Sequence, residues 1–143
     1  MSHVSVAIVG SQKSIASALL ALSKDKEIQV HSCYNHVAEL FSVVTEPIPD
    51  VVLVDFAMVT ESHYALLLEL HRSRPKTRII FLCNNSSETK LIDAFRYGAS
   101  GFLESKDNDA FLAKAIRAVN NGEAWVPRHF VTKIVERLTE KSS

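Results

Sequence analysis

The sequence predicts an α/β fold in which a doubly wound parallel sheet of five strands carries helices on both faces. Short β-branched runs alternate five times with longer stretches whose apolar residues recur at helical spacing. One run, residues 51–54, is apolar throughout, which is typical of a strand covered on both sides. Parallel strands need long right-handed crossovers, and a helix between each pair of strands supplies one.

The elements expected from this alternation can be placed along the chain. The expected strands are residues 4–9, 28–33, 51–54, 78–83 and 101–104. The expected helices contain the apolar patterns at residues 15–22, 37–44, 66–70, 91–95 and 111–119, and Gly98 and Gly122 are interpreted as helix stops. For five such units the common strand order is 2-1-3-4-5, a flavodoxin-like three-layer sandwich with a ligand crevice at the carboxyl ends of strands 1 and 3.

The pattern changes after Gly122, which divides residues 1–122 from a linker and helix at residues 123–143. A sixth amphipathic helix is expected after Pro127, a residue that a helix start tolerates. Its apolar residues are Phe130, Val131, Ile134, Val135 and Leu138. This apolar stripe must be covered by the domain itself, by a second chain or by a further domain.

Composition narrows the class of protein. The 143 residues include 16 Lys and Arg against 16 Asp and Glu, and 47% are hydrophobic, so the chain is expected to fold and not to be disordered. A zero formal charge argues against a domain that binds DNA by its own electrostatics. No signal peptide and no apolar run of about 20 residues is evident, so we expect a cytoplasmic protein without a membrane segment.

The residues just past each strand end occupy the predicted crevice. They are Gly10, Ser11, Asp55, Cys83, Ser105 and Lys106. Among them only Asp55 is a carboxylate, and an aspartate after an apolar strand can be either a reactive group or the cap of a turn. Cys83 can be a redox thiol or a small buried hydrophobic residue.

Three segments resemble one family, the response-regulator receiver domain of the LuxR/NarL type. Asp50-Val-Val-Leu-Val-Asp55-Phe-Ala-Met58 looks like the phosphoacceptor strand of that family. Ala94-Phe-Arg-Tyr-Gly-Ala-Ser-Gly-Phe-Leu103 looks like its fourth helix and fifth strand, and Asn121-Gly-Glu-Ala-Trp-Val-Pro127 like its exit linker. The resemblance covers roughly residues 3 to 138.

The resemblance makes Asp55 the equivalent of the phosphoacceptor. Most of the side chains that surround the phosphoacceptor in the family are replaced by other residue types in this sequence. Gly10 and Ser11 align with its acidic pair, Cys83 with its Thr or Ser, and Ser105 with its Lys, while Lys106 lies one residue late. Ala57 is a further pocket position, and Phe102 takes the position of the switch aromatic. Since Mg²⁺ needs anionic oxygen ligands, its binding is expected to be weak or absent, and no cofactor or other metal site is expected.

We therefore expect an atypical, non-enzymatic receiver of a transcription regulator, phosphorylated poorly or not at all and acting by protein interaction. The expected partners are a histidine kinase or a second copy, through the face of the fourth and fifth helices or through the linker helix. DNA would be bound only through a helix-turn-helix domain beyond residue 143. Two alternatives remain: a conventional phosphorelay receiver in which Asp55 is phosphorylated with the help of Lys106, and a flavodoxin-like module that binds a small anion near Ser11.

Overall fold

The computed structural model describes residues 3–40, 48–84, 88–104 and 108–142, and it contains a five-stranded parallel sheet in the order β2-β1-β3-β4-β5. The strands are β1 (Val4–Val9), β2 (Ile28–Tyr34), β3 (Val51–Asp55), β4 (Arg78–Cys83) and β5 (Gly101–Glu104). The helices are α1 (Gln12–Leu22), α3 (Tyr64–Ser73), α4 (Glu88–Phe95), α5 (Asn108–Asn120) and α6 (Arg128–Ser142). The predicted fold class and strand order are confirmed, and each expected strand is present with at most one residue added.

The expected second helix is described only at its start. A short 3-10 turn spans Val37–Glu39, and the side chains of Val37 and Leu40 are buried. Residues 41–47, which carry the rest of that helical pattern, lie outside the described residues. Two further 3-10 turns, Phe56–Met58 and Glu61–His63, lead from β3 to α3.

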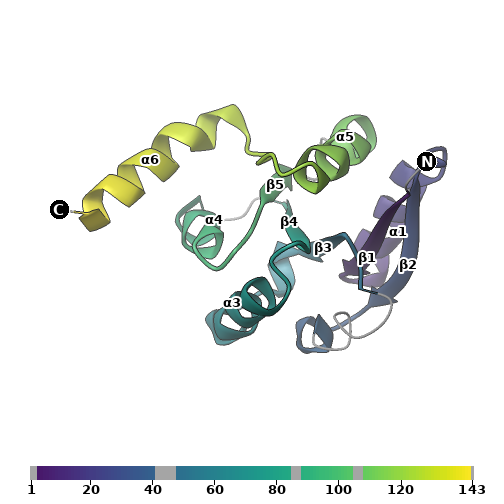
Figure 1. Ribbon diagram of the computed structural model, residues 1–143, viewed down its shortest axis with the longest axis horizontal. Helices are drawn as coiled ribbons and strands as arrows, with labels where there is room; N and C mark the ends of the chain where they lie inside the picture. The colour runs from purple at the N-terminus through teal and green to yellow at the C-terminus, as the bar shows by residue number, and fades with distance from the viewer. Residues whose placement is uncertain (1–2, 41–47, 85–87, 105–107, 143) are drawn as a thin grey trace.

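The sheet lies between two helical layers, and the alternation of side chains along each strand decides which layer they meet. In β3, Val52 and Val54 pack toward α3, α4 and α6, whereas Val51 and Leu53 pack toward α1 and α5. Figure 1 shows the sheet near the centre with α1 and α5 to one side and α3 and α4 to the other. Because both faces are covered, the continuously apolar β3 is buried as the sequence predicts.

The amino-terminal edge of the sheet is closed by a pair of residues from neighbouring strands. Asp50, directly before β3, accepts hydrogen bonds from the Ser5 amide at 2.9 Å and from the Ser5 hydroxyl at 3.2 Å. The amide of Asp50 donates to Ser5 Oγ at 2.9 Å. Asp50 therefore fastens β1 to β3 at the end of the strand opposite to Asp55.

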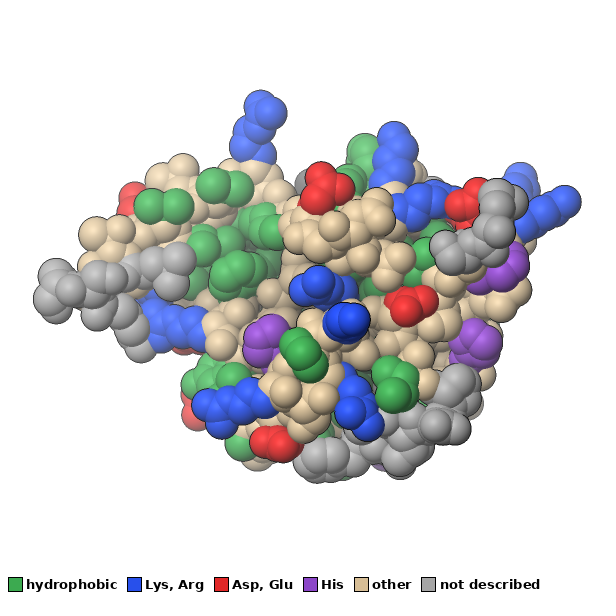
Figure 2. All heavy atoms as spheres, viewed as in Figure 1, with side chains coloured by type: hydrophobic (Ala, Val, Ile, Leu, Met, Phe, Trp, Pro, Cys, Tyr) green, Lys and Arg blue, Asp and Glu red, His purple; other side chains and the backbone are tan. Residues whose placement is uncertain are grey.

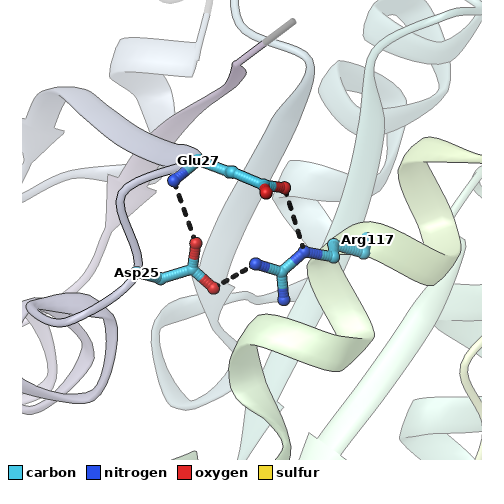
Figure 3. A network of polar contacts seen from close by, with 3 residues as sticks. All are labelled: Asp25, Glu27 and Arg117. Carbon is cyan, nitrogen blue, oxygen red and sulfur yellow. Dashed lines mark hydrogen bonds and ion pairs between the residues drawn. The ribbon is translucent and has the colours of Figure 1, made fainter. Parts of the chain in front are cut away.

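A second polar network fastens α5 to the loop between α1 and β2. The Arg117 guanidinium donates to Asp25 Oδ2 and lies 3.8 Å from Glu27 Oε2, and Asp25 in turn accepts from the Glu27 amide at 3.0 Å. Figure 3 shows the three residues converging from the two elements. Together with the apolar contacts between α1 and α5, this network holds one helical layer of the sandwich together.

The helix α6 leaves the sandwich and lies beside α4, so that part of the apolar stripe of α6 is covered. Phe130 and Ile134 are buried in the cluster that contains α3 and α4, whereas Val131 and Val135 are 48% and 56% exposed. Figure 2 shows hydrophobic side chains gathered along α6 and in the angle between α6 and the rest of the molecule. The domain itself thus covers one side of the stripe, and the boundary at residue 122 stays a prediction.

Within the described ranges, none of the helices combines the length and the apolar character that crossing a bilayer would require.

Candidate functional site

The carboxyl edge of the sheet brings the ends of β1 and β3 together. A Cβ atom placed on Gly10 would lie 3.4 Å from Asp55 Cβ, so the turn after β1 contacts the aspartate directly. Asp55 itself is half-buried and ends β3, paired in register with Leu82 of β4. The predicted crevice residues Gly10 and Asp55 are therefore neighbours in the structure.

Asp55 also caps the turn that follows it. Its Oδ1 accepts a hydrogen bond from the Ala57 amide at 3.1 Å, at the start of the 3-10 turn Phe56–Met58. The capping interpretation of this aspartate therefore holds. A cap through one oxygen leaves the second carboxylate oxygen without a bond to Ala57, so the cap does not exclude chemistry at Asp55, whose role as a phosphoacceptor stays a prediction.

The turn after β1 is built without acidic side chains. Ser11 caps α1 by accepting from the Ser14 amide at 3.1 Å, and Ser14 Oγ donates to the Ser11 carbonyl at 3.1 Å. Asn35 donates to the Gly10 carbonyl at 3.3 Å, and the Gly10 amide donates to the Tyr34 carbonyl at 2.9 Å. A Cβ on Gly10 would overlap Ser14 Oγ, so a larger residue at position 10 would require Ser14 to rotate.

The thiol of Cys83 is buried at the end of β4. It donates weakly to the Phe81 carbonyl, with sulfur and oxygen 3.5 Å apart. Burial, followed by the negative charges of Glu104 and Asp55, raises the pKa of Cys83 to about 12. Since the thiolate is the reactive form, the structure favours the small buried hydrophobic residue over the redox thiol.

A carboxylate that the sequence analysis did not consider lies at the end of β5. Glu104 pairs in register with Cys83, and its Oε1 lies 3.2 Å from Nε2 of His129 at the start of α6. Glu104 is the last residue of the predicted strand and not one of the residues just past it, where the crevice residues are expected. The glutamate that ends the predicted strand Gly-Phe-Leu-Glu was the signal in the sequence for this carboxylate.

Phe102, for which the family resemblance predicts the role of the switch aromatic, lies in the core. It is 1% exposed, and its ring centroid lies 6.1 Å from that of Phe81, 6.0 Å from that of Phe95 and 6.4 Å from that of Phe130. The strand β5 therefore connects two places: Glu104 lies at the carboxyl edge of the sheet, and Phe102 packs on Phe130 of α6.

The remaining two predicted pocket residues, Ser105 and Lys106, lie outside the described residues. Among those that are described, no three His, Cys, Asp or Glu side chains gather where they could hold a metal ion. Among the described residues at this end of the sheet, Gly10 and Ser11 bring no anionic oxygen to Asp55, and Glu104 Oε1 lies beside Nε2 of His129. Weak or absent binding of Mg²⁺ stays a prediction.

A doubly wound sheet of this order, with an aspartate at the end of its third strand, defines the class of fold to which signalling receivers belong. Residues 6–117 match the family described as the response regulator receiver domain. The chain belongs to this family.

Individual relatives agree with the family match. The chain is 29% identical over 125 residues to the oxygen regulatory protein NreC of Staphylococcus aureus, a match that covers 87% of this chain and 58% of NreC. It therefore spans less than two thirds of the length of the curated relatives it matches.

Solved structures share the fold at lower identity. The isolated receiver domain of RcsB from Salmonella enterica serovar Typhimurium, in the apo form, has a TM-score of 0.79 at 18% identity, over 94% of this chain and 99% of that one. A LuxR-family response regulator from Aurantimonas sp. SI85-9A1 has a TM-score of 0.78 at 19% identity, over 96% and 99%. These structures share the fold, and the family match over residues 6–117 confirms the resemblance to receiver domains.

Proposed function

We propose that this chain is the receiver part of a LuxR/NarL-type transcription regulator in which Asp55 is phosphorylated poorly or not at all. It acts in the cytoplasm as a regulatory, non-enzymatic unit, through contacts with other proteins. The observation that carries this proposal is the turn at Gly10 and Ser11. It lies against Asp55 and contains only uncharged side chains where the family has its acidic pair.

The charges around Asp55 support the proposal. A phosphorylated Asp55 would carry about two negative charges, and phosphoryl transfer is catalysed mainly by positioning and by neutralising charge. Asp55 and Glu104 both act on Cys83 as negative charges, so the carboxyl edge already holds two carboxylates. Without a cation held by neighbouring carboxylates, both the transfer and the product lack their main stabilisation.

The partner is a protein surface, and the two candidates are a histidine kinase and a second copy of the chain. The exposed Val131 and Val135, four residues apart on α6, support a dimer through the linker helix. RcsB, which shares the fold, has been solved as dimers bound to DNA. DNA binding by this regulator would lie in a helix-turn-helix domain outside the present sequence.

Intact-mass analysis after incubation with acetyl phosphate and Mg²⁺ tests the proposal. We expect the mass of the wild-type chain to stay unchanged, as in the Asp55→Ala control, while an active receiver treated in parallel gains one phosphoryl group. Stoichiometric modification of the wild type that disappears in Asp55→Ala would establish the second candidate, a conventional phosphorelay receiver.

That second candidate is favoured by the position of Asp55, a half-buried carboxylate at the crevice with one oxygen engaged by the Ala57 amide. Beryllofluoride with Mg²⁺ separates the two candidates, because a ligand that binds only the folded state raises the melting temperature. We expect no rise. A rise that needs Mg²⁺ supports phosphorylation, and a rise with an anion alone supports the small-anion module.

A further inference from the structure

A groove of about 580 Å³ lies between α3, α4 and α6, and Asp55 is not among its lining residues. It is lined by Glu61, Tyr64, Ala65, Leu68, Asp93, Arg96, Tyr97 and Arg137. They belong to the 3-10 turn Glu61–His63, to α3, to α4 and the turn that follows it, and to α6, which supplies Arg137. The groove therefore exists in this form only while α6 is docked.

Two guanidinium groups in the groove have a buried nitrogen without an acceptor. Among the described residues, the buried side-chain nitrogens that form no hydrogen bond are Nη2 of Arg96 and Nε of Arg137, and both arginines line this groove. Buried polar groups are almost always paired, so both arginines keep hydrogen-bonding capacity that no described protein group uses. Both side chains are half-buried and line the groove, so part of each stays open to it.

An aromatic wall stands beside these donors. The rings of Tyr64 and Tyr97 are stacked, with centroids 4.6 Å apart and planes inclined by 23°. Burial, followed by the negative charges of Asp93 and Glu61, raises the pKa of Tyr64. With Ala65 and Leu68 as its other apolar members, the wall can cover the body of a flat ligand.

The charges in the groove limit the anion that it can take. Arg137 Nη2 donates to Asp93 Oδ1 at 2.9 Å, so this carboxylate is already matched by a guanidinium. Arg96 supplies a second positive charge, and Glu61 a negative one that would repel a multiply charged anion. A single carboxylate on an apolar body suits this balance better than a phosphate does.

We propose that the groove binds a small aromatic carboxylate, whose carboxylate accepts from Arg96 and Arg137 while its ring packs on Tyr64 and Tyr97. The ligand would join the end of α4 to α6 and so hold α6 in its docked position. As a regulatory signal this binding rests on the proposed function, because a receiver that is not phosphorylated needs another input. As a binding event it does not involve Asp55.

Titration of the full chain with phenylacetate, followed by NMR of the arginine Nε–Hε and backbone amide signals, tests the proposal. We expect saturable shifts at Arg96, Arg137 and Tyr97, with a dissociation constant of about 1 mM for a ligand of this size. Phenylacetamide, which lacks the charge, and inorganic phosphate, which lacks the ring, should each bind at least about tenfold more weakly.

Three variants complete the design. Arg96→Gln should weaken phenylacetate binding about tenfold, and Arg96→Lys, which keeps the charge and loses the planar fork, should weaken it by a smaller factor. Arg128→Gln removes an exposed arginine of α6 that does not line the groove, and it should bind as the wild type does. Asp55→Ala should also bind unchanged, which keeps this outcome separate from the phosphorylation assay.

Absence of saturable shifts in the wild type would overturn the proposal. Because this measurement needs no variant, it decides the matter even if Arg96→Gln does not fold. Equal binding of phenylacetate and phosphate would also overturn it, since the aromatic wall would then contribute nothing.

Discussion

Phe130 of α6 packs against Phe102 of β5, with ring centroids 6.4 Å apart and ring planes inclined by 67°. Glu104, two residues after Phe102, approaches His129, the residue before Phe130, at 3.2 Å. Two consecutive residues of α6, His129 and Phe130, thus hold this helix to β5.

Replacing Phe130 by alanine should release α6. Phe130 is 5% exposed, so its truncation should reduce the free energy of unfolding of the docked helix by about 3 to 5 kcal/mol. Hydrogen exchange of the α6 amides should then become faster, while exchange in β1 and β3 stays unchanged. Val131→Ala, at a position that is 48% exposed, should change the free energy of opening measured by hydrogen exchange by no more than about 0.5 kcal/mol. Equal effects of the two variants would contradict the docked position of the helix.

Two glycines with positive φ form a matched pair for a second prediction. At Gly98, φ is +101° and an added Cβ would lie 2.6 Å from His71 Cβ, whereas at Gly122, φ is +90° and the nearest atom, of Arg78, is 4.0 Å away. Gly122→Ala should therefore cost about 1 kcal/mol of stability from backbone strain alone, and Gly98→Ala about 2 kcal/mol or more. Thermal unfolding measures both variants. If His71→Gly restores none of the loss in Gly98→Ala, the steric explanation is wrong.

The network around Arg117 should contribute modestly to stability. The Arg117 side chain is 40% exposed and that of Asp25 16%, so solvent screens the pair in part and Arg117→Ala should cost only about 1 kcal/mol. A double-mutant cycle with Asp25→Ala should give a coupling energy of about 0.5 to 1 kcal/mol that decreases in 1 M salt. Lys114→Ala, on the same helix, is the control and should leave stability within about 0.5 kcal/mol. A coupling energy of zero would show that the apolar contacts alone hold α5 to α1.

The raised pKa of Cys83 predicts a loss of stability at high pH. Its value of about 12 in the folded state lies above the ordinary value of 9.0, so the folded state keeps a proton that the unfolded state releases. The contribution of Cys83 is therefore fully present below pH 9 and falls by at most about 1.4 kcal/mol per pH unit between pH 9 and pH 12. Urea unfolding at pH 8 and pH 10 should show a smaller decrease for Cys83→Ala than for the wild type.

A labelling experiment checks the same thiol independently. In the folded protein at pH 8, the exposed Cys33 should react with a disulfide reagent and the buried Cys83 should not. The Cys33→Ser variant should then show no labelling until it is unfolded. Rapid labelling of native Cys33→Ser would mean that Cys83 is accessible and its thiolate populated.

The sheet could be predicted from the sequence because its signals are local. The alternation of β-branched runs with helical spacing is set by residues a few positions apart, and the apolar run of β3 requires burial on both faces. Asp55 and Gly10 could be brought together for a related reason, since the strand order puts the ends of β1 and β3 side by side. Resemblance to the family then supplied the roles that order alone does not assign.

The position of α6 could not be predicted in the same way. An amphipathic stripe shows that Phe130 and Ile134 need cover, but many surfaces can provide it, and the pairing with Phe102 spans 28 positions of the chain. The groove at Arg96 is lined in part by Arg137 of α6, so it could not be predicted from the sequence either. The sequence allowed two interpretations of Asp55, a reactive group and the cap of a turn. The hydrogen bond from the Ala57 amide shows that it serves at least as a cap.

Rebuilding the acidic turn provides the strictest test of the proposed defect at Asp55. Gly10→Asp and Ser11→Asp would restore two carboxylates beside Asp55, and Ser14→Ala would remove the hydroxyl that a Cβ at position 10 overlaps. Aspartate at position 11 keeps a side-chain cap for α1.

Without metal the triple variant should be less stable than the wild type, because like charges gather at one edge. Mg²⁺ at ten times its dissociation constant should then stabilise it by about 1.4 kcal/mol and leave the wild type unchanged. Removing Asp55 from the triple variant should abolish most of this gain. Stabilisation of the wild type by Mg²⁺ to the same extent would mean that the uncharged turn at Gly10 and Ser11 is no obstacle to metal binding, and the proposal of a defective receiver would fail.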